Sequence, residues 1–280
     1  IRVSPTAPPP PGEGVWDDAL FDLSDALNLA RLSSERFEDV EVWVGAGEHT
    51  PGRGSGLRET SFALPSGVRV VGGFAGDETA RDQRDPTAHR TVLTGDLNGD
   101  DEPALPASTA ENALRVVTAF STGAGTLLEG VTVTAGRADV SSLDDGGGLS
   151  AGSATRELRD VYFTRNAGVV GGAIRVWDGS DVTLVDAVIT GNSSQFAGAV
   201  GVDRSRLAMR RGLVSGNSAT ITGTLFFQNS DAEISGSVIA GNSAGFSAGL
   251  HFESDTSGTN SALVTNTLVA HTTAASARAG

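Results

Sequence analysis

An asparagine that returns at a nearly constant interval limits the possible folds of this 280-residue chain more than any other feature. Asn166, Asn192, Asn217 and Asn242 are separated by 26, 25 and 25 residues. Each has an apolar residue three positions before it and two more at eight and ten positions after it. Columns that keep their chemistry through four units are the sequence signature of a solenoid, in which each repeat packs mainly against its neighbours.

The spacing within each repeat indicates the kind of solenoid. Apolar residues lie two apart in short runs, as in Ile174 and Val176 or Val182 and Leu184, and glycines and serines interrupt the runs. This is the period of a β-strand rather than of a helix. The 37 glycines and the 5% aromatic content suit many tight bends around an aliphatic core. The sequence therefore predicts an all-β fold, a parallel β-helix solenoid of about 25 residues per coil, each coil advancing by roughly 4.8 Å.

The recurring asparagine has a functional and a structural interpretation. In a parallel β-helix each residue lies above its counterpart one coil away, so stacked amides can hydrogen-bond to one another and to the backbone. We predict that Asn166, Asn192, Asn217 and Asn242 form a structural ladder at one bend rather than a ligand site.

The two ends of the chain depart from the repeat. Residues 1–14 are proline-rich and are expected to form a linker. In residues 15–38, helical spacing over 17–33 predicts an α-helix that caps the N-terminal end of the solenoid, where apolar side chains and strand edges would otherwise be exposed. Residues 39–280 are assigned to the β-helix. Thr272 stands where the asparagine column would continue, so we expect further coils or a closing element from outside this chain.

Composition excludes several classes of function. A net charge of −14 disfavours a nucleic-acid partner, which requires a basic patch. Every one of the 20 Lys or Arg residues is arginine and there is no cysteine, so lysine and thiolate chemistry are ruled out. No apolar run is long enough for a transmembrane helix, and none is expected.

Two stretches resemble a known class of proteins. "FTRNAGVVGGAI" (163–174) is similar to the paired Phe-x-x-Asn and Gly-Gly-Ala-Ile motifs of polymorphic outer membrane proteins. Residues 42–101 resemble the N-terminal part of secreted β-helix proteins of the pectin lyase-like class. The resemblance implies a right-handed parallel β-helix that is extracellular or lies on the bacterial cell surface, often with an adhesive role. Polysaccharide lyases and glycoside hydrolases share this fold, so the fold alone does not decide the function.

The loop "GDLNGDDE" is the candidate metal site. Asp96, Asn98, Asp100, Asp101 and Glu102 place oxygen atoms at alternate and adjacent positions of a tight loop, as calcium-binding loops do. The pattern departs from a complete EF-hand at its sixth and last positions. Calcium is the one cofactor that the sequence suggests, and a solvated acidic turn between coils is the alternative.

A column of outward-facing polar residues is the candidate ligand site. In the lyases that the chain resembles, stacked carboxylates hold calcium against an acidic sugar and a basic residue abstracts a proton. Asp178, Asp203, Arg204 and Arg206 are the nearest analogue here. The run of arginines in 204–211 is a candidate contact for an acidic glycan or a neighbouring subunit, and ordinary solvation of a turn is the alternative.

The sequence assigns no catalytic residues. Adjacent acids such as Asp144 and Asp145 usually point apart, whereas glycoside hydrolysis needs two carboxylates at a set separation. Short coils also leave little chain for the walls of a substrate groove. We therefore expect a non-catalytic secreted or cell-surface β-helix with a structural, adhesive or assembly role, whose partners are a glycan, other copies of itself or surface proteins. The alternative is a polysaccharide lyase or glycoside hydrolase that acts on an acidic glycan.

Overall fold

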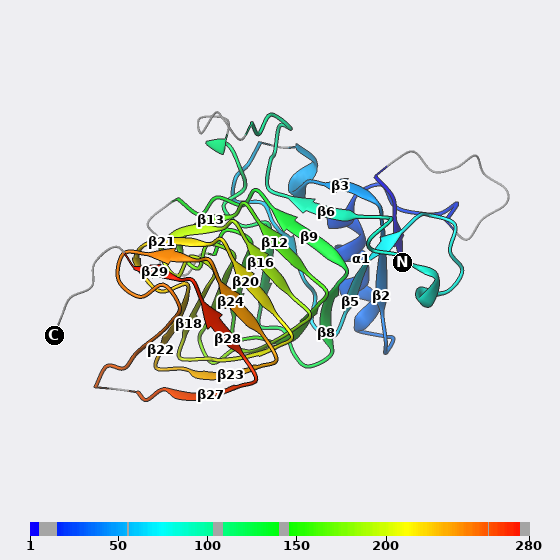
Figure 1. Cartoon of the computed structure of the whole chain (residues 1–280). Helices are drawn as coiled ribbons and strands as arrows, with labels where there is room; N and C mark the ends of the chain where they lie inside the picture. The colour runs from blue at the N-terminus through cyan, green and yellow to red at the C-terminus, as the bar shows by residue number, and fades with distance from the viewer. Residues whose placement is uncertain (6–15, 55, 103–108, 140–145, 257, 275–280) are drawn as a thin grey trace.

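Parallel β-sheets wound by a single chain form the body of the molecule (Figure 1). The computed structural model describes residues 1–5, 16–54, 56–102, 109–139, 146–256 and 258–274. The strands stack as a β-solenoid of about 8 turns, and every pairing between its named strands is parallel. The predicted all-β parallel β-helix is confirmed.

One coil shows the path of the chain. Strands β14 (Ile174–Trp177), β15 (Asp181–Val185), β16 (Val188–Thr190) and β17 (Ser193–Phe196) follow one another around the axis. The next strand, β18 (Val200–Asp203), then lies beside β14 with Ile174 opposite Val200. The repeat of the sequence is therefore one turn of the solenoid.

The strands form four sheets, which we name A to D. Sheet A contains β1 (Arg2–Val3), β2 (Glu41–Gly45), β5 (Arg69–Phe74), β8 (Thr126–Glu129), β11 (Thr155–Arg159), β15, β19 (Arg206–Arg210), β23 (Asp231–Ser235) and β27 (Ser261–Thr265). Sheet B contains β3 (Gly47–His49), β6 (Thr91–Thr94), β9 (Val131–Thr134), β12 (Tyr162–Thr164), β16, β20 (Leu213–Ser215), β24 (Val238–Ala240) and β28 (Leu268–Ala270).

Sheets C and D complete each turn. Sheet C contains β4 (Phe62–Ala63), β7 (Val117–Phe120), β10 (Leu149–Gly152), β14, β18, β22 (Leu225–Gln228) and β26 (Leu250–Glu253). Sheet D is shorter and contains β13 (Ala167–Val170), β17, β21 (Ser218–Thr222), β25 (Ser243–Ala244) and β29 (Thr273–Ala274). Two short 3₁₀ helices, η1 (Pro51–Gly54) and η2 (Arg81–Gln83), lie in connections between strands.

The core consists of stacked columns of apolar side chains. Because side chains alternate along a strand, every second residue points into the solenoid. On sheet A one column runs through the partners Val70, Leu128, Leu158, Leu184, Met209 and Ile234. Each of these side chains is at most 1% exposed. Burial of such side chains contributes about 1.5–3 kcal/mol each, so the columns are the main source of stability.

The four periodic asparagines form a ladder inside the solenoid. Asn192 Nδ2 donates to Asn217 Oδ1 at 3.0 Å, and Asn217 Nδ2 donates to Asn242 Oδ1 at 3.1 Å. Each asparagine is 1% exposed. Its Nδ2 also donates to a backbone carbonyl in the sheet B strand of the previous coil, as Asn192 Nδ2 does to the Phe163 carbonyl at 3.1 Å. The ladder therefore satisfies buried backbone groups at the bend, which would otherwise cost about 1–3 kcal/mol each.

Glycines beside the ladder give the backbone room. A Cβ atom on Gly172 would lie 2.5 Å from the Gly198 carbonyl oxygen of the next coil, and one on Gly198 would lie 2.6 Å from that of Ser218. Neighbouring coils approach each other here more closely than any side chain allows.

The helix α1 (Leu23–Ser34) covers the N-terminal end of the solenoid. Its buried residues Leu23, Ala26, Leu27 and Ala30 belong to the same core cluster as the columns. In Figure 1 α1 lies beside β2, at the opposite end from β27 and β28. The helix begins later than the predicted position 17 because the Asp22 side chain accepts the Asp25 backbone N–H and caps the helix there.

The first residues of the expected linker belong to the solenoid. Strand β1 pairs with β2, with Arg2 opposite Trp43 and Val3 opposite Val44, and Val3 is fully buried. Residues 6–15, which complete that expected linker, lie outside the described residues.

One core column contains an arginine. Arg156 occupies the position of Val182 in the next coil and is 3% exposed. Its Nη2 donates to the Ala119 carbonyl at 2.9 Å and to Thr122 Oγ1 at 3.0 Å, whereas Nε and Nη1 have no hydrogen-bond partner. Burial lowers the pKa of this guanidinium to about 10. The site is costly, because a charge is removed from water and no carboxylate among the described residues forms an ion pair with it.

Candidate functional site

The acidic loop after β6 is held in a tight turn by its own side chains. Asp96 Oδ1 accepts the backbone N–H groups of Gly99 and Asp100 at 2.7 and 3.2 Å, and Oδ2 accepts that of Asp101 at 3.1 Å. Asn98 Oδ1 accepts the Asp100 N–H at 3.2 Å. These hydrogen bonds stabilise a local turn, and the turn by itself explains the Asp, Asn and Gly residues of the motif.

The turn brings together a group of carboxylates that differs from the expected one. Oxygen atoms of Asp96, Asp100, Asp101 and Glu111 all lie within 4.8 Å of one another. Glu102, which the sequence also suggested, is not among these acids, and the Oδ1 atom of Asn98 accepts the Asp100 N–H. We call these four residues the carboxylate cluster. Glu111 enters it from the return of the chain towards β7, which the loop motif does not include.

The environment of the carboxylate cluster disfavours its negative charge. Burial raises the pKa of Asp101 most, repulsion from Asp96 and Asp100 raises it further, and the Asn112 amide and Arg165 oppose the rise. Burial and the charges of the other three acids raise the pKa of Glu111. A cation at this position would relieve both effects.

The four candidate ligand residues lie at one bend of the solenoid and just beyond it. Asp203 Oδ2 lies 2.9 Å from Arg204 Nη2 and 3.7 Å from Arg175 Nη2 at the end of β18. Asp178 instead accepts a hydrogen bond from Ser153 Oγ. Asp178 and Arg204 occupy the same bend in successive coils, where the Gly179 N–H donates to the Arg204 carbonyl at 2.9 Å, whereas Arg206 lies beyond that bend on sheet A.

The arginines of 204–211 on sheet A are paired with acids. Arg206 contacts Asp181 Oδ1 at 3.0 Å and Glu233 Oε2 at 2.6 Å, and the pKa of Arg206 is raised, chiefly by its hydrogen bond to Asp181. Glu233 also contacts Arg210 at 3.2 Å. This surface is a ladder of opposite charges rather than a basic patch.

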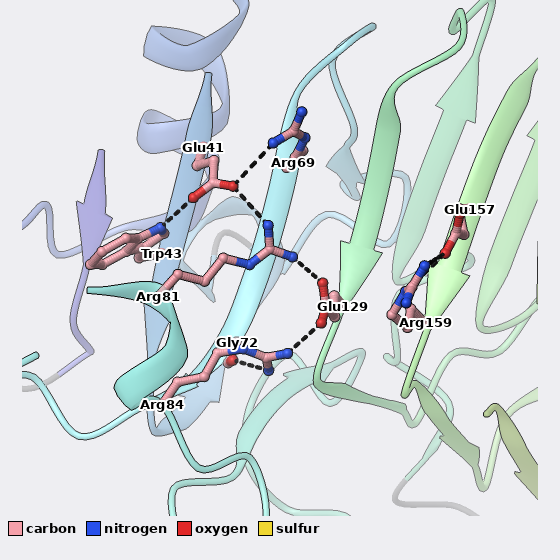
Figure 2. Close-up of polar contacts among 9 residues, drawn as sticks. All are labelled: Glu41, Trp43, Arg69, Gly72, Arg81, Arg84, Glu129, Glu157 and Arg159. Atoms are coloured by element: carbon pink, nitrogen blue, oxygen red, sulfur yellow. Dashed lines mark hydrogen bonds and ion pairs between the residues drawn. The ribbon is translucent and has the colours of Figure 1, made fainter. Parts of the chain in front are cut away.

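A second ladder of charges lies near the N-terminal end of sheet A (Figure 2). Glu41 Oε1 accepts from Arg81 Nη1 at 2.9 Å and from Arg69 Nη1 at 3.5 Å. Arg81 also donates to Glu129, which forms a second ion pair with Arg84. Arg81 and Arg84 project from η2 and its C-cap, so the ion pairs hold this connection against β2, β5 and β8.

A shallow groove of about 490 Å³ runs along this surface. Its lining includes Arg69, Arg81 and Glu129, and one coil further along Glu157 and Arg159, which pair with each other. Since each of these arginines already contacts a carboxylate of the chain, an acidic ligand would have to compete with those ion pairs.

The last coil exposes its inward-facing side chains. Val264 and Val269 continue the columns of Ile234 and Ile239, which are 0% exposed, yet both valines are 43% exposed. Strands β26, β27, β28 and β29 each pair with the preceding coil only, among the strands that the structure describes. This end therefore presents both apolar surface and unpaired backbone groups.

Other expected groups have simpler placements. Asp144 and Asp145 lie outside the described residues. His49 is 4% exposed at the start of a sheet B column, with Leu93 as its partner in the next coil and the Gly45 carbonyl 3.1 Å from its Nε2.

No helix in the described part of the chain is long and apolar enough to cross a membrane.

Comparisons with known proteins gave no family model, no curated protein and no solved structure that matches this chain.

Proposed function

We propose that this chain is a non-catalytic structural β-solenoid of the cell surface or extracellular space, and that its last described coil is an interface on which further β-strands pack. In a solution of the 280-residue chain, the last coil of a second copy would supply those strands. The observation that carries the proposal is the contrast between Val264 and Val269, each 43% exposed, and the fully buried residues one coil earlier. Association of these surfaces would bury apolar columns that are already ordered, so little conformational entropy would be lost.

The covered N-terminal end of the solenoid favours a closed dimer, in which two last coils meet, over an open filament. Helix α1 covers the first coil, so a last coil has no equivalent surface to meet at the N-terminal end. A contact between two identical last coils is isologous and closes after two copies.

Charge sets the conditions of this association. The chain carries a net charge of −14, so two copies repel one another at low ionic strength. The exposed column residues Val264 and Val269 are uncharged, and salt screens the repulsion between charges that are farther apart than the Debye length of about 8–10 Å. We expect association to strengthen as salt is raised.

Sedimentation velocity tests the proposal. The wild-type chain should form dimers as its concentration and the salt concentration increase. A Val264→Lys, Val269→Lys double variant should remain monomeric, because it places two like charges on each end. Leu213→Lys is the matched control, since Leu213 is 39% exposed on the outer face of sheet B two coils earlier, and it should dimerise as the wild type does. A wild-type chain that is monomeric at every concentration would overturn the proposal.

The groove on sheet A supports a second candidate function, which is binding or cleavage of an acidic glycan. Its support is the alignment of Arg69, Arg81 and Arg159 beside Glu129 and Glu157. Incubation with polygalacturonate, alginate or chondroitin, followed by ultraviolet absorbance and by a binding titration, tests it. Unsaturated product or saturable binding that is lost in Arg159→Ala would favour this function over a purely structural one; no product and no binding would reject it.

A further inference from the structure

The carboxylate cluster has three buried oxygen atoms that lack a donor. Asp101 Oδ1, Glu111 Oε1 and Asn112 Oδ1 are inaccessible to solvent and have no hydrogen-bond partner. All three atoms are acceptors, and a buried acceptor without a donor costs about 1–3 kcal/mol. Water can donate to such acceptors, but a cation both satisfies several of them at once and offsets the charge of the acids.

The side chain of Asn112 is a second observation that points to a ligand at the carboxylate cluster. It is a neutral residue, 2% exposed, and its Nδ2 donates to Asp101 Oδ2 at 2.9 Å. Its amide group therefore lies against the carboxylate cluster, with the carbonyl oxygen unpartnered. An asparagine that only stabilised the turn would have its oxygen paired with a backbone N–H group, as Asn98 has.

The ligand types of the cluster indicate which cation fits. Calcium takes six to eight oxygen ligands in flexible geometry, whereas magnesium demands a near-ideal octahedron and usually keeps several waters beside one or two carboxylates. Oxygen atoms of four acids lie within 4.8 Å of one another, and a set this rich in carboxylates suits calcium better. A cavity of about 100 Å³ beside Asp101 and Asn112 has room for water ligands as well.

The hydrogen bonds of the turn are compatible with an ion. Asp96 accepts two backbone N–H groups at Oδ1 and one at Oδ2, so Oδ2 keeps a lone pair for a metal. Arg165 also lines that cavity, and its single positive charge offsets only part of the charge of four acids.

We propose that Asp96, Asp100, Asp101 and Glu111, with the side-chain oxygen of Asn112, bind one calcium ion. The ion joins the turn after β6 to the segment that leads into β7, and so fixes both ends of the excursion between these strands. This ligand set adds Glu111 and Asn112 to Asp96, Asp100 and Asp101 of the sequence motif and leaves out Glu102.

Isothermal titration calorimetry with calcium chloride tests the site on the complete chain after treatment with EGTA. We expect one calcium ion per chain, an affinity for magnesium at least tenfold weaker, and a higher melting temperature with calcium than with EGTA. Glu111→Gln and Asp100→Asn should each weaken calcium binding at least tenfold. Asp100 is exposed, so its variant should fold even if the other does not, and circular dichroism checks both.

Glu102→Gln is the matched control, since Glu102 is adjacent to Asp101 but lies outside the carboxylate cluster. It should bind calcium as the wild type does. Two results would overturn the proposal. One is no saturable heat and no change in melting temperature up to about 10 mM calcium, which is above the range of weak extracellular sites. The other is loss of binding in Glu102→Gln with full binding in Glu111→Gln.

Discussion

Asn192 Oδ1 accepts two hydrogen bonds from Asn166 one coil earlier, from the backbone N–H and from Nδ2, each at 3.0 Å. The same oxygen thus serves the backbone and the side chain of its neighbour. Because Asn217 does the same for Asn192, and Asn242 for Asn217, the bend repeats with one geometry.

Asn192→Ala should lower the free energy of unfolding by about 2–4 kcal/mol. The variant leaves the Phe163 carbonyl and the Asn166 N–H buried without their partners, at about 1–3 kcal/mol each. Chemical denaturation measures the change. Gln195→Ala, an exposed position in β17, is the control and should differ from wild type by less than about 0.5 kcal/mol. Equal stability of the two variants would show that the ladder is not structural.

The ladder and the columns could be predicted because a solenoid places each repeat in an equivalent environment. The carboxylate cluster could be predicted only in part. Asp96, Asp100 and Asp101 are close in sequence, whereas Glu111 joins them through the tertiary path of the chain, which no local motif encodes.

The candidate ligand column shows a different limit of sequence reasoning. Asp203 and Arg206 are three residues apart, but a bend with Arg204 at φ +44° takes the chain from sheet C to sheet A between them. Neighbours in sequence therefore face different surfaces. The contacts of Arg81 and Arg84 with Glu129 likewise depend on how η2 folds over sheet A. Such a contact does not recur from coil to coil, so the sequence repeat does not predict it.

Glu129→Gln should destabilise the protein by about 2–4 kcal/mol, because it leaves Arg81 and Arg84 without their shared carboxylate in a largely buried setting. Figure 2 also supplies the control, since Glu157 on the next strand pairs with Arg159 at the surface. Glu157→Gln should cost less than about 1 kcal/mol. Thermal and urea denaturation compare them, and similar losses in both variants would contradict this assignment.

Stability should fall in mild acid partly because of His49. Burial lowers the pKa of His49 below 6.5, and the bond to Gly45 and the charge of Asp22 oppose this only in part. Below pH 6.5 the unfolded chain therefore binds a proton that the folded chain does not, and the free energy of unfolding decreases as the pH falls towards the lowered pKa, by at most about 1.4 kcal/mol per pH unit. His49→Gln should show a shallower decrease between pH 7 and pH 5. An unchanged slope would exclude His49 as the source.

Arg156→Met should stabilise the solenoid by about 1–3 kcal/mol. The variant keeps the aliphatic part of the side chain in the column and removes a buried charge whose pKa is lowered to about 10. The advantage over wild type should shrink above pH 10, where the folded arginine loses its proton before the unfolded one does. Denaturation at pH 7 and pH 10.5 measures both effects, and a less stable variant at pH 7 would mean that the charge has a partner in solution.

Spin labels on single cysteines test most directly whether the last coil is an interface. The chain has no cysteine of its own, so labels at Leu268→Cys in the last coil and at Phe37→Cys just after α1 are unique in each variant. With about 8 turns of roughly 4.8 Å each, two copies joined by their last coils should place the Phe37 labels more than about 60 Å apart and the Leu268 labels within about 40 Å. Double electron–electron resonance should therefore give a short distance for the Leu268 label alone. No coupling at that position, or a short distance only between the Phe37 labels, would contradict assembly through the last coil.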